Sequence, residues 1–288
     1  MKFTIIIVAA IFLSDRVASN ENRDVKKTLY PIGIAMLGVG FIVTVLERDL
    51  GSMVVMISII FTLLFLANAP LSKLVIGGLL VLAAGGLAIA STQYRRDRFM
   101  TFLQPERDCT TTGYHACQAL IAVGSGGLIG LGLGNSVQAY GYLPEASNDS
   151  IFAIYAEKFG FIGSLVLLSL YGSLLYRIIL VVRRAGDEYS KLISGGIFAW
   201  FSVQAFINIG AMLGLMPLKG ITLPFISYGG TSLMFVLAAL GLVYRASGYT
   251  VMRRSINGSE GGRSYESTSS NINRRGNGRS HYTATSRS

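Results

Sequence analysis

The chain has 288 residues, of which 51% are hydrophobic and only 14% are charged, and its mean hydropathy is +0.53. Soluble domains carry about 25% charged residues, so this composition excludes an ordinary soluble enzyme. The apolar residues lie in long runs, which also excludes disordered, collagen-like and coiled-coil chains. The net charge of +10 would suggest nucleic-acid binding in a soluble protein, but in a membrane protein topology accounts for it first.

Apolar runs along the chain predict an all-α, polytopic transmembrane helical bundle, since a spanning helix needs about 20 apolar residues. The candidate spans are 3–13, 29–46, 52–67, 71–90, 151–182, 192–215 and 233–244. These ranges predict about seven spans, of which the first and the last need neighbouring residues to reach full length. We expect one membrane domain over 1–245 with a long loop at 91–150, and a disordered tail rich in Ser, Asn, Gly and Arg over 246–288.

The first segment has two interpretations, because Val17-Ala18-Ser19 after a short apolar run resembles a signal-peptide cleavage site. If the segment is instead a retained span that enters from outside, 16 Lys and Arg fall on the inner side and seven on the outer side. Without the tail and the long loop the count is eight against three in the same direction. The positive-inside rule therefore favours the retained span, with the long loop outside and the basic tail along the anionic inner leaflet.

Carboxylates near the predicted spans are the first candidates for chemistry, because a carboxylate inside a bilayer costs several kcal/mol. Glu47 and Asp49 end the second span. Glu145 and Asp149 lie four residues apart just before the fifth span, and Glu157 lies about two turns inside it. Asp149 also stands in an Asn-Asp-Ser sequence that suits a helix N-cap. Its spacing alone leaves capping and catalysis equally open.

The long loop divides into two parts of different character. Residues 94–98 include Arg95 and Arg96 in a cationic cluster, which suggests a phosphate-bearing ligand or a balance of nearby acids. Residues 119–134 are apolar but contain six glycines in 16 residues. That composition predicts an interfacial or re-entrant element rather than a plain spanning helix.

Two further features stand in the loops. Cys109, His115 and Cys117 are too few for a structural zinc site, so we expect a short-loop disulfide or two free thiols. Residues 214–232 contain two prolines and paired glycines, and such broken backbone is tolerated at membrane depth only where it is buried or lines a cavity. Lys219 within this segment suits either an anionic ligand or an interface anchor.

These features together resemble the SEDS family, named for shape, elongation, division and sporulation. Leu143-Pro144-Glu145-Ala146, Asp149, Ile151-Phe152-Ala153 and 159–163 are similar to its "LPEAHTDFIFA…ELGFIG" signature. Residues 217–232 look like its second signature, and the Lys-Gly-Ile-Thr form at 219–222 is closer to the division branch than to the elongation branch.

The resemblance implies a glycosyltransferase that polymerises lipid II into peptidoglycan strands at the outer face of the cell inner membrane, at the division septum. It implies a class B penicillin-binding protein as partner, other division proteins, and no nucleic acid. The essential acid of the family falls on Asp149, which would remove the proton of the acceptor hydroxyl. Substrate contacts are expected from Arg95, Arg96, Glu145, Lys219, Ser227, Thr231 and Asp49. We expect the pyrophosphate to be neutralised by basic side chains or by a divalent cation, Mg or Mn, with no protein metal ligands assigned.

Departures from the family pattern keep two other functions open. The family has about ten spans, and this chain begins where the fourth is expected, while Ser147, Asn148, Ser150 and Lys158 replace family residues around the acid. One alternative is a non-catalytic or truncated division scaffold. The other is a lipid II flippase, although transporters usually show internal repeats and we detect none.

Overall fold

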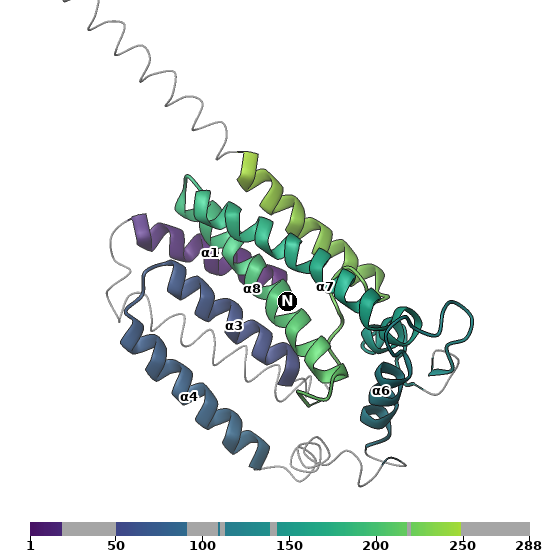
Figure 1. Ribbon diagram of the computed structural model, residues 1–288. Coiled ribbons are helices and arrows are strands. Elements are labelled where there is room, and N and C mark those ends of the chain that lie inside the picture. The colour runs from purple at the N-terminus through teal and green to yellow at the C-terminus, as the bar shows by residue number, and fades with distance from the viewer. Residues whose placement is uncertain (19–49, 91–108, 110–112, 139–142, 218–219, 249–288) are drawn as a thin grey trace, which may run out of the picture.

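The computed structural model describes residues 1–18, 50–90, 109, 113–138, 143–217 and 220–248. They form helices without a β-strand, which confirms the predicted all-α class (Figure 1). The helices are α1 (Lys2–Ala18), α3 (Leu50–Leu66), α4 (Leu71–Ala90), α6 (Tyr114–Ser125), α7 (Ile151–Arg184), α8 (Glu188–Met212) and a C-terminal helix (Gly230–Gly248).

Three of the described helices are long and apolar enough to cross a membrane, namely α7, α8 and the C-terminal helix. Shorter apolar helices cover Gly51–Leu66 and Leu71–Leu80. The predicted spans over 52–67, 71–90 and 151–182 therefore coincide with helices. The predicted span over 29–46 and residues 249–288 of the predicted tail lie outside the described residues.

Helix α8 is the centre of the bundle, with α1, α3 and α7 packed against it (Figure 1). In the most apolar window of α8 72% of the residues are buried, whereas in α7 only 11% are. Apolar residues at helical spacing on α1, on α3 and on α8 itself are fully buried in the core. They are Ile6, Ala10 and Leu13 of α1, Val55, Ile59 and Leu63 of α3, and Leu192, Ile197 and Phe201 of α8. The first predicted segment thus supplies one wall of the core.

Glycines let these helices approach closely. A Cβ on Gly195 of α8 would overlap the side chain of Leu66, and one on Gly196 would lie 2.8 Å from Cγ2 of Ile6. Small residues at such crossings are the usual means of helix association in membranes, where no hydrophobic effect drives helices together.

The ends of two predicted spans differ from the structure. Helix α8 stops at Met212 rather than at residue 215, because Gly214 adopts a positive φ of 69° and the N–H of Leu215 turns back to the carbonyl of Gly210 at 2.8 Å. The last predicted span, 233–244, extends in both directions to Gly230 and Gly248, so it includes the first residues of the predicted tail.

The glycine-rich part of the long loop runs beside a break in α7. At Gly160 the helix has φ 66° and ψ −163°, which only glycine adopts readily. Across this break the N–H of Phe161 donates to the carbonyl of Gly127 at 2.9 Å, and the N–H of Leu131 donates to the carbonyl of Glu157 at 2.9 Å. The described part of the loop thus contains the short helix α6 and an irregular glycine segment, while an interfacial or re-entrant position for it stays a prediction.

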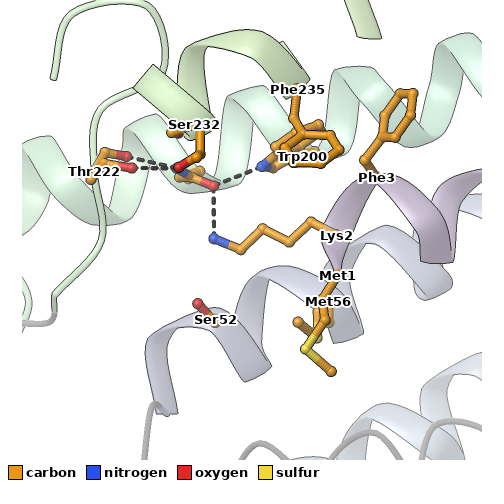
Figure 2. Close-up of a pocket in the computed structure, with 11 residues that line it drawn as sticks. Met1, Lys2, Phe3, Ser52, Met56, Trp200, Thr222, Ser232 and Phe235 are labelled. Carbon is orange, nitrogen blue, oxygen red and sulfur yellow. Dashed lines mark hydrogen bonds between the residues drawn. The ribbon is translucent and has the colours of Figure 1, made fainter. Parts of the chain in front are cut away.

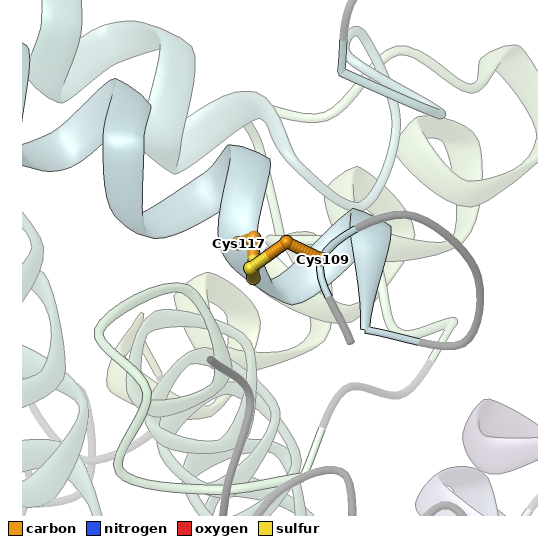
Figure 3. The surroundings of a disulfide bond; sticks show 2 residues. All are labelled: Cys109 and Cys117. Carbon is orange, nitrogen blue, oxygen red and sulfur yellow. A yellow bond between two sulfur atoms is a disulfide. The ribbon is translucent and has the colours of Figure 1, made fainter. Parts of the chain in front are cut away.

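Cys109 and Cys117 form a disulfide, with Cα atoms 5.6 Å apart (Figure 3). The bond joins residue 109 to the first turn of α6, so of the two alternatives from the sequence the disulfide is present. Both thiols are used, and the described residues contain no group of three or more His, Cys, Asp or Glu suited to a metal ion.

Candidate functional site

Asp149 lies in a tight loop between Leu143 and the start of α7. Glu145 begins this loop with a positive φ of 50°, and its carbonyl accepts the N–H groups of Asn148 at 3.0 Å and Ser150 at 3.2 Å. Ser150, not Asp149, occupies the N-cap position of α7. The structure therefore does not support the capping alternative for Asp149, whose side chain is half-buried.

Ser150 instead fastens the loop to its surroundings. Its hydroxyl donates to the carbonyl of Pro144 at 3.0 Å, and its Oγ lies 2.7 Å from Nε2 of His115 on α6. Since the hydroxyl proton points to Pro144, the imidazole Nε2–H is the donor to Ser150. The first turn of α6, which the disulfide also joins, thereby supports the residue next to Asp149.

The second irregular segment lies directly against this loop. Ser227 donates its hydroxyl to the carbonyl of Asn148 at 2.7 Å and accepts the N–H of Leu223 at 2.6 Å. The N–H of Tyr228 donates to the carbonyl of Ser147 at 2.9 Å. The loop of Asp149 and this segment, about 80 residues apart in sequence, are therefore joined by hydrogen bonds. The loop supplies the carbonyls of Ser147 and Asn148, and the segment supplies the hydroxyl of Ser227 and the N–H of Tyr228.

Gly220 forms the wall beside the carboxylate of Asp149. A Cβ at residue 220 would stand 3.2 Å from Oδ2 of Asp149, tighter than an ordinary contact. Glycine at this position lets the backbone approach the acid closely, which is one of the uses of glycine at ligand sites.

Phe225 in the same segment has a backbone conformation that bulky residues rarely adopt, with φ 70°. Its ring packs edge-on against Phe201 at 5.2 Å and Tyr171 at 6.4 Å between centroids. This aromatic packing offsets the strain, and strained residues held in this way cluster at functional sites.

The same segment contributes Thr222 to the lining of a pocket of about 350 Å³ (Figure 2). Its lining combines apolar side chains with hydroxyl groups and one lysine. The residues are Met1, Lys2, Phe3, Ser52, Met56, Trp200, Gln204, Thr222, Thr231, Ser232 and Phe235. Figure 2 shows Lys2 extended across the pocket from α1 toward α8, where its Nζ donates to Oε1 of Gln204 at 3.0 Å.

Gln204 organises the inner wall of the pocket. Its Oε1 also accepts the indole N–H of Trp200 at 2.7 Å, and its Nε2 donates to the carbonyl of Thr222 at 2.7 Å. One turn further along α8, Nδ2 of Asn208 donates to the carbonyls of Ile221 at 2.6 Å and Asp149 at 2.7 Å. Trp200, Gln204 and Asn208 thus form a polar stripe at four-residue spacing, from the pocket to the loop of Asp149.

Glu157 is the one fully buried carboxylate of the described residues, with 1% of its surface exposed. Its oxygens accept the hydroxyl of Ser136 at 2.5 Å and the N–H groups of Val137 at 2.9 Å and Gln138 at 3.2 Å. Three donors from residues 136–138, directly after the glycine-rich part of the loop, therefore satisfy it. Its role is to join that loop to α7, not to face the pocket.

The residues predicted from the sequence separate into distinct places. Asp149 and Ser227 meet at the joined loops, while Thr231 lines the pocket with Lys2. Glu145 is exposed and accepts the side-chain amide of Asn148 at 2.5 Å, so it bonds within its own loop. The remaining predicted residues, Arg95, Arg96, Lys219 and Asp49, lie outside the described residues.

Sequence reasoning did not single out Lys2, Gln204 or Asn208 as site residues. The signal for the two amides was present, because Gln204 and Asn208 are polar residues four apart in an otherwise apolar span, and polar residues in spans are functional by default. Lys2 indicated only how the chain is oriented in the membrane, since a lysine at the end of a span usually anchors the helix at the interface.

The fold and the site define a polytopic membrane protein with a lysine-containing polar pocket among its helices and a half-buried carboxylate between two irregular segments. The chain belongs to the FtsW/RodA/SpoVE family, described as cell cycle proteins, whose model matches residues 1–251. The resemblance to the SEDS family seen in its motifs is confirmed.

Similar proteins from several bacteria carry names of this family. The chain is 39% identical over 251 residues to the probable peptidoglycan glycosyltransferase FtsW of Saccharophagus degradans, covering 85% of this chain and 64% of that protein. It is 43% identical to the protein of the same name from Coxiella burnetii, covering 85% and 66%. It is 37% identical to the stage V sporulation protein E of Bacillus subtilis, covering 87% and 68%. The chain therefore spans just under two thirds of the length of the two FtsW relatives.

Solved structures agree with this assignment. One similar chain comes from a structure described as "Structural coordination of polymerization and crosslinking by a peptidoglycan synthase complex". It superposes with a TM-score of 0.69 at 27% identity, covering 86% of this chain and 68% of that one. The rod shape determining protein RodA of Thermus thermophilus gives a TM-score of 0.54 at 27% identity, covering 84% and 62%.

Proposed function

We propose that this chain carries the catalytic part of a peptidoglycan glycosyltransferase that polymerises lipid II during septal cell-wall synthesis. The observation that carries the proposal is the position of Asp149, a half-buried carboxylate where its own loop meets a second irregular segment, which also contributes Thr222 to a polar pocket. The names of the FtsW relatives support the same activity.

In this mechanism Asp149 acts as general base. The acceptor sugar hydroxyl attacks the anomeric carbon of the donor while its proton passes to the carboxylate of Asp149. The bond between the anomeric carbon and the pyrophosphate oxygen breaks, and its electron pair leaves with undecaprenyl pyrophosphate. Because pyrophosphate is already a good leaving group, a second carboxylic acid of the kind that glycosidases use is not required.

The pocket suits the anionic part of the substrate. Lys2 supplies an ammonium group, and the hydroxyls of Ser52, Thr222, Thr231 and Ser232 are donors for phosphate oxygens. Thr222 in the pocket is two residues from Gly220 beside Asp149, a reach of at most about 7 Å of chain. Arg95, Arg96 and Lys219 stay predictions for the same task, as do substrate contacts from Glu145, Ser227 and Asp49.

A divalent cation also stays a prediction. The described residues contain no cluster that would bind such an ion by themselves. Mg²⁺ is often bound through substrate phosphates and one or two carboxylates, so a cation would be brought by the pyrophosphate. No step of the proposed mechanism passes through it.

The partner and the location follow from the same activity. We expect a class B penicillin-binding protein to supply the crosslinking step, in line with the peptidoglycan synthase complex whose chain this one resembles. The membrane would be the plasma membrane, with the site on its outer face, and the protein would act at the division septum with other division proteins.

The test is lipid II polymerisation by the purified full chain with its cognate penicillin-binding protein, read as glycan strands on a gel. Asp149→Ala and Asp149→Asn should reduce strand formation by about 10²–10⁴-fold, the usual contribution of a general base. Glu188→Gln is the matched control, because Glu188 pairs with Lys191 at the far end of α8 and should leave the rate unchanged.

Each other result points to a different function. Full activity of Asp149→Ala would reject the mechanism. Strands from neither the native protein nor the variants would favour the division scaffold. Transfer of lipid II across vesicle bilayers by the native protein, without strands, would favour the flippase.

A further inference from the structure

Asn208 links the two segments that surround Asp149. Its Nδ2 donates one hydrogen bond to the carbonyl of Asp149 at 2.7 Å and one to the carbonyl of Ile221 at 2.6 Å. An amide NH₂ group has two protons, so both are used. Because both neighbours are carbonyl oxygens, the orientation of the amide is unambiguous.

The buried side-chain amide of Asn208 lowers the stability of the helix bundle at one of its atoms. Asn208 is 1% exposed, and among the described residues its Oδ1 has no hydrogen-bond partner. Leaving a buried oxygen unpaired costs about as much free energy as two ordinary hydrogen bonds contribute. The net gain in stability from Asn208 is therefore small, and its main effect is on geometry.

That geometry fixes both the acid and the wall beside it. The bond to the carbonyl of Asp149 sets the position of its backbone, and the bond to the carbonyl of Ile221 sets the backbone next to Gly220. A Cβ at Gly220 would stand only 3.2 Å from Oδ2 of Asp149, so the backbone of this segment lies close to the carboxylate. A shift of either segment would move the carboxylate relative to a bound acceptor.

We propose that Asn208 is a positioning residue for the glycosyl-transfer step, acting through Asp149, whereas Gln204 one turn earlier serves substrate binding. Gln204 makes the matching bond to the carbonyl of Thr222, but it also bonds Lys2 in the pocket. Asn208 therefore acts on the loop of Asp149, and Gln204 acts on the pocket that would bind the anionic part of the substrate. This inference rests on the proposed function.

Steady-state kinetics of lipid II polymerisation by the full chain with its cognate partner separates the two roles. Asn208→Ala should lower kcat by about 10–100-fold with KM within twofold, since misplacement by about 1 Å costs up to about 10²-fold. Gln204→Ala should mainly raise KM. Ser194→Ala is the control, because Ser194 is fully buried on the same helix with no partner for its Oγ among the described residues, and its kinetics should not change.

A double-mutant cycle with Asp149→Glu distinguishes positioning from a general structural role. In that variant the carboxylate is already displaced, so Asn208→Ala should cost much less than it does in the native protein. Additive losses, an unchanged kcat, or a loss confined to KM would overturn the inference. If Asn208→Ala does not fold, Asn208→Ser, which retains one donor, carries the same expectations.

The failure of this inference is distinguishable from the failure of the proposed function. If Asp149→Ala abolishes strand formation while Asn208→Ala and Asn208→Ser keep native kcat, only the positioning role is rejected. If Asp149→Ala retains full activity, both are rejected.

Discussion

Glu157 shows how a buried carboxylate can serve structure rather than chemistry. Removing it in Glu157→Ala leaves the hydroxyl of Ser136 and the N–H groups of Val137 and Gln138 without their acceptor. An unsatisfied buried donor costs roughly 1–3 kcal/mol, so this variant should unfold at a clearly lower temperature. Glu157→Gln retains an acceptor oxygen, and Ser136 can reverse its role toward the amide, so its loss should stay below about 1 kcal/mol.

Thermal unfolding in detergent, together with limited proteolysis of the glycine-rich loop, measures both variants. Glu188→Gln is the control, since it removes only a partly exposed ion pair with Lys191. An equal fall in unfolding temperature for Glu157→Gln and Glu157→Ala would mean that the loop requires the negative charge of Glu157 rather than only its acceptor oxygens.

At the scale of single residues the sequence predicts chemistry only where the signal is local. Asp149 could be singled out because an acid directly before an apolar run is unusual in a membrane protein. Lys2, Gln204 and Thr222 could not be grouped, because they come from α1, α8 and the segment after it and meet only through tertiary packing. Ser227 was predicted to contact substrate, while its hydrogen bonds join it to Asn148 and Leu223.

At the scale of elements, the break in α7 is the least expected feature. Apolar content predicts one helix from residue 151 to 182, and only the two-sided contact with the glycine-rich loop explains why Gly160 departs from helical geometry. The six glycines of that loop do predict irregular backbone, but the sequence does not show which helix the loop contacts.

The break predicts opposite effects for two glycines of the same helix. In Gly160→Ala the new Cβ would overlap the backbone of Gly130, and the φ of 66° would strain any other residue, so stability should fall by roughly 1–3 kcal/mol. Gly172→Ala places a Cβ in open space within regular helix and should be neutral or stabilising by up to about 1 kcal/mol. Melting temperatures of the two purified variants give the comparison. A tolerated Gly160→Ala would mean that α7 is a continuous helix.

At the scale of the whole molecule, one orientation connects the charge pattern, the disulfide and the proposed chemistry. Disulfides persist in oxidising compartments, so the bond between Cys109 and Cys117 fits a loop outside the membrane. The inner-side excess of Lys and Arg leads to the same orientation independently. In that orientation Asp149, at the end of the loop, would lie on the outer side, as the proposed reaction requires.

Cysteine labelling tests this orientation directly. In a Cys109→Ser, Cys117→Ser background, Asn135→Cys lies at an exposed position of the long loop, and Tyr189→Cys lies at an exposed position between α7 and the body of α8. A membrane-impermeant maleimide applied to spheroplasts should label Asn135→Cys and should label Tyr189→Cys only after the cells are broken. The reverse pattern would place Asp149 on the cytoplasmic side, where a base could not act on strands growing outside, and the proposed reaction would have to be abandoned even if the fold were correct.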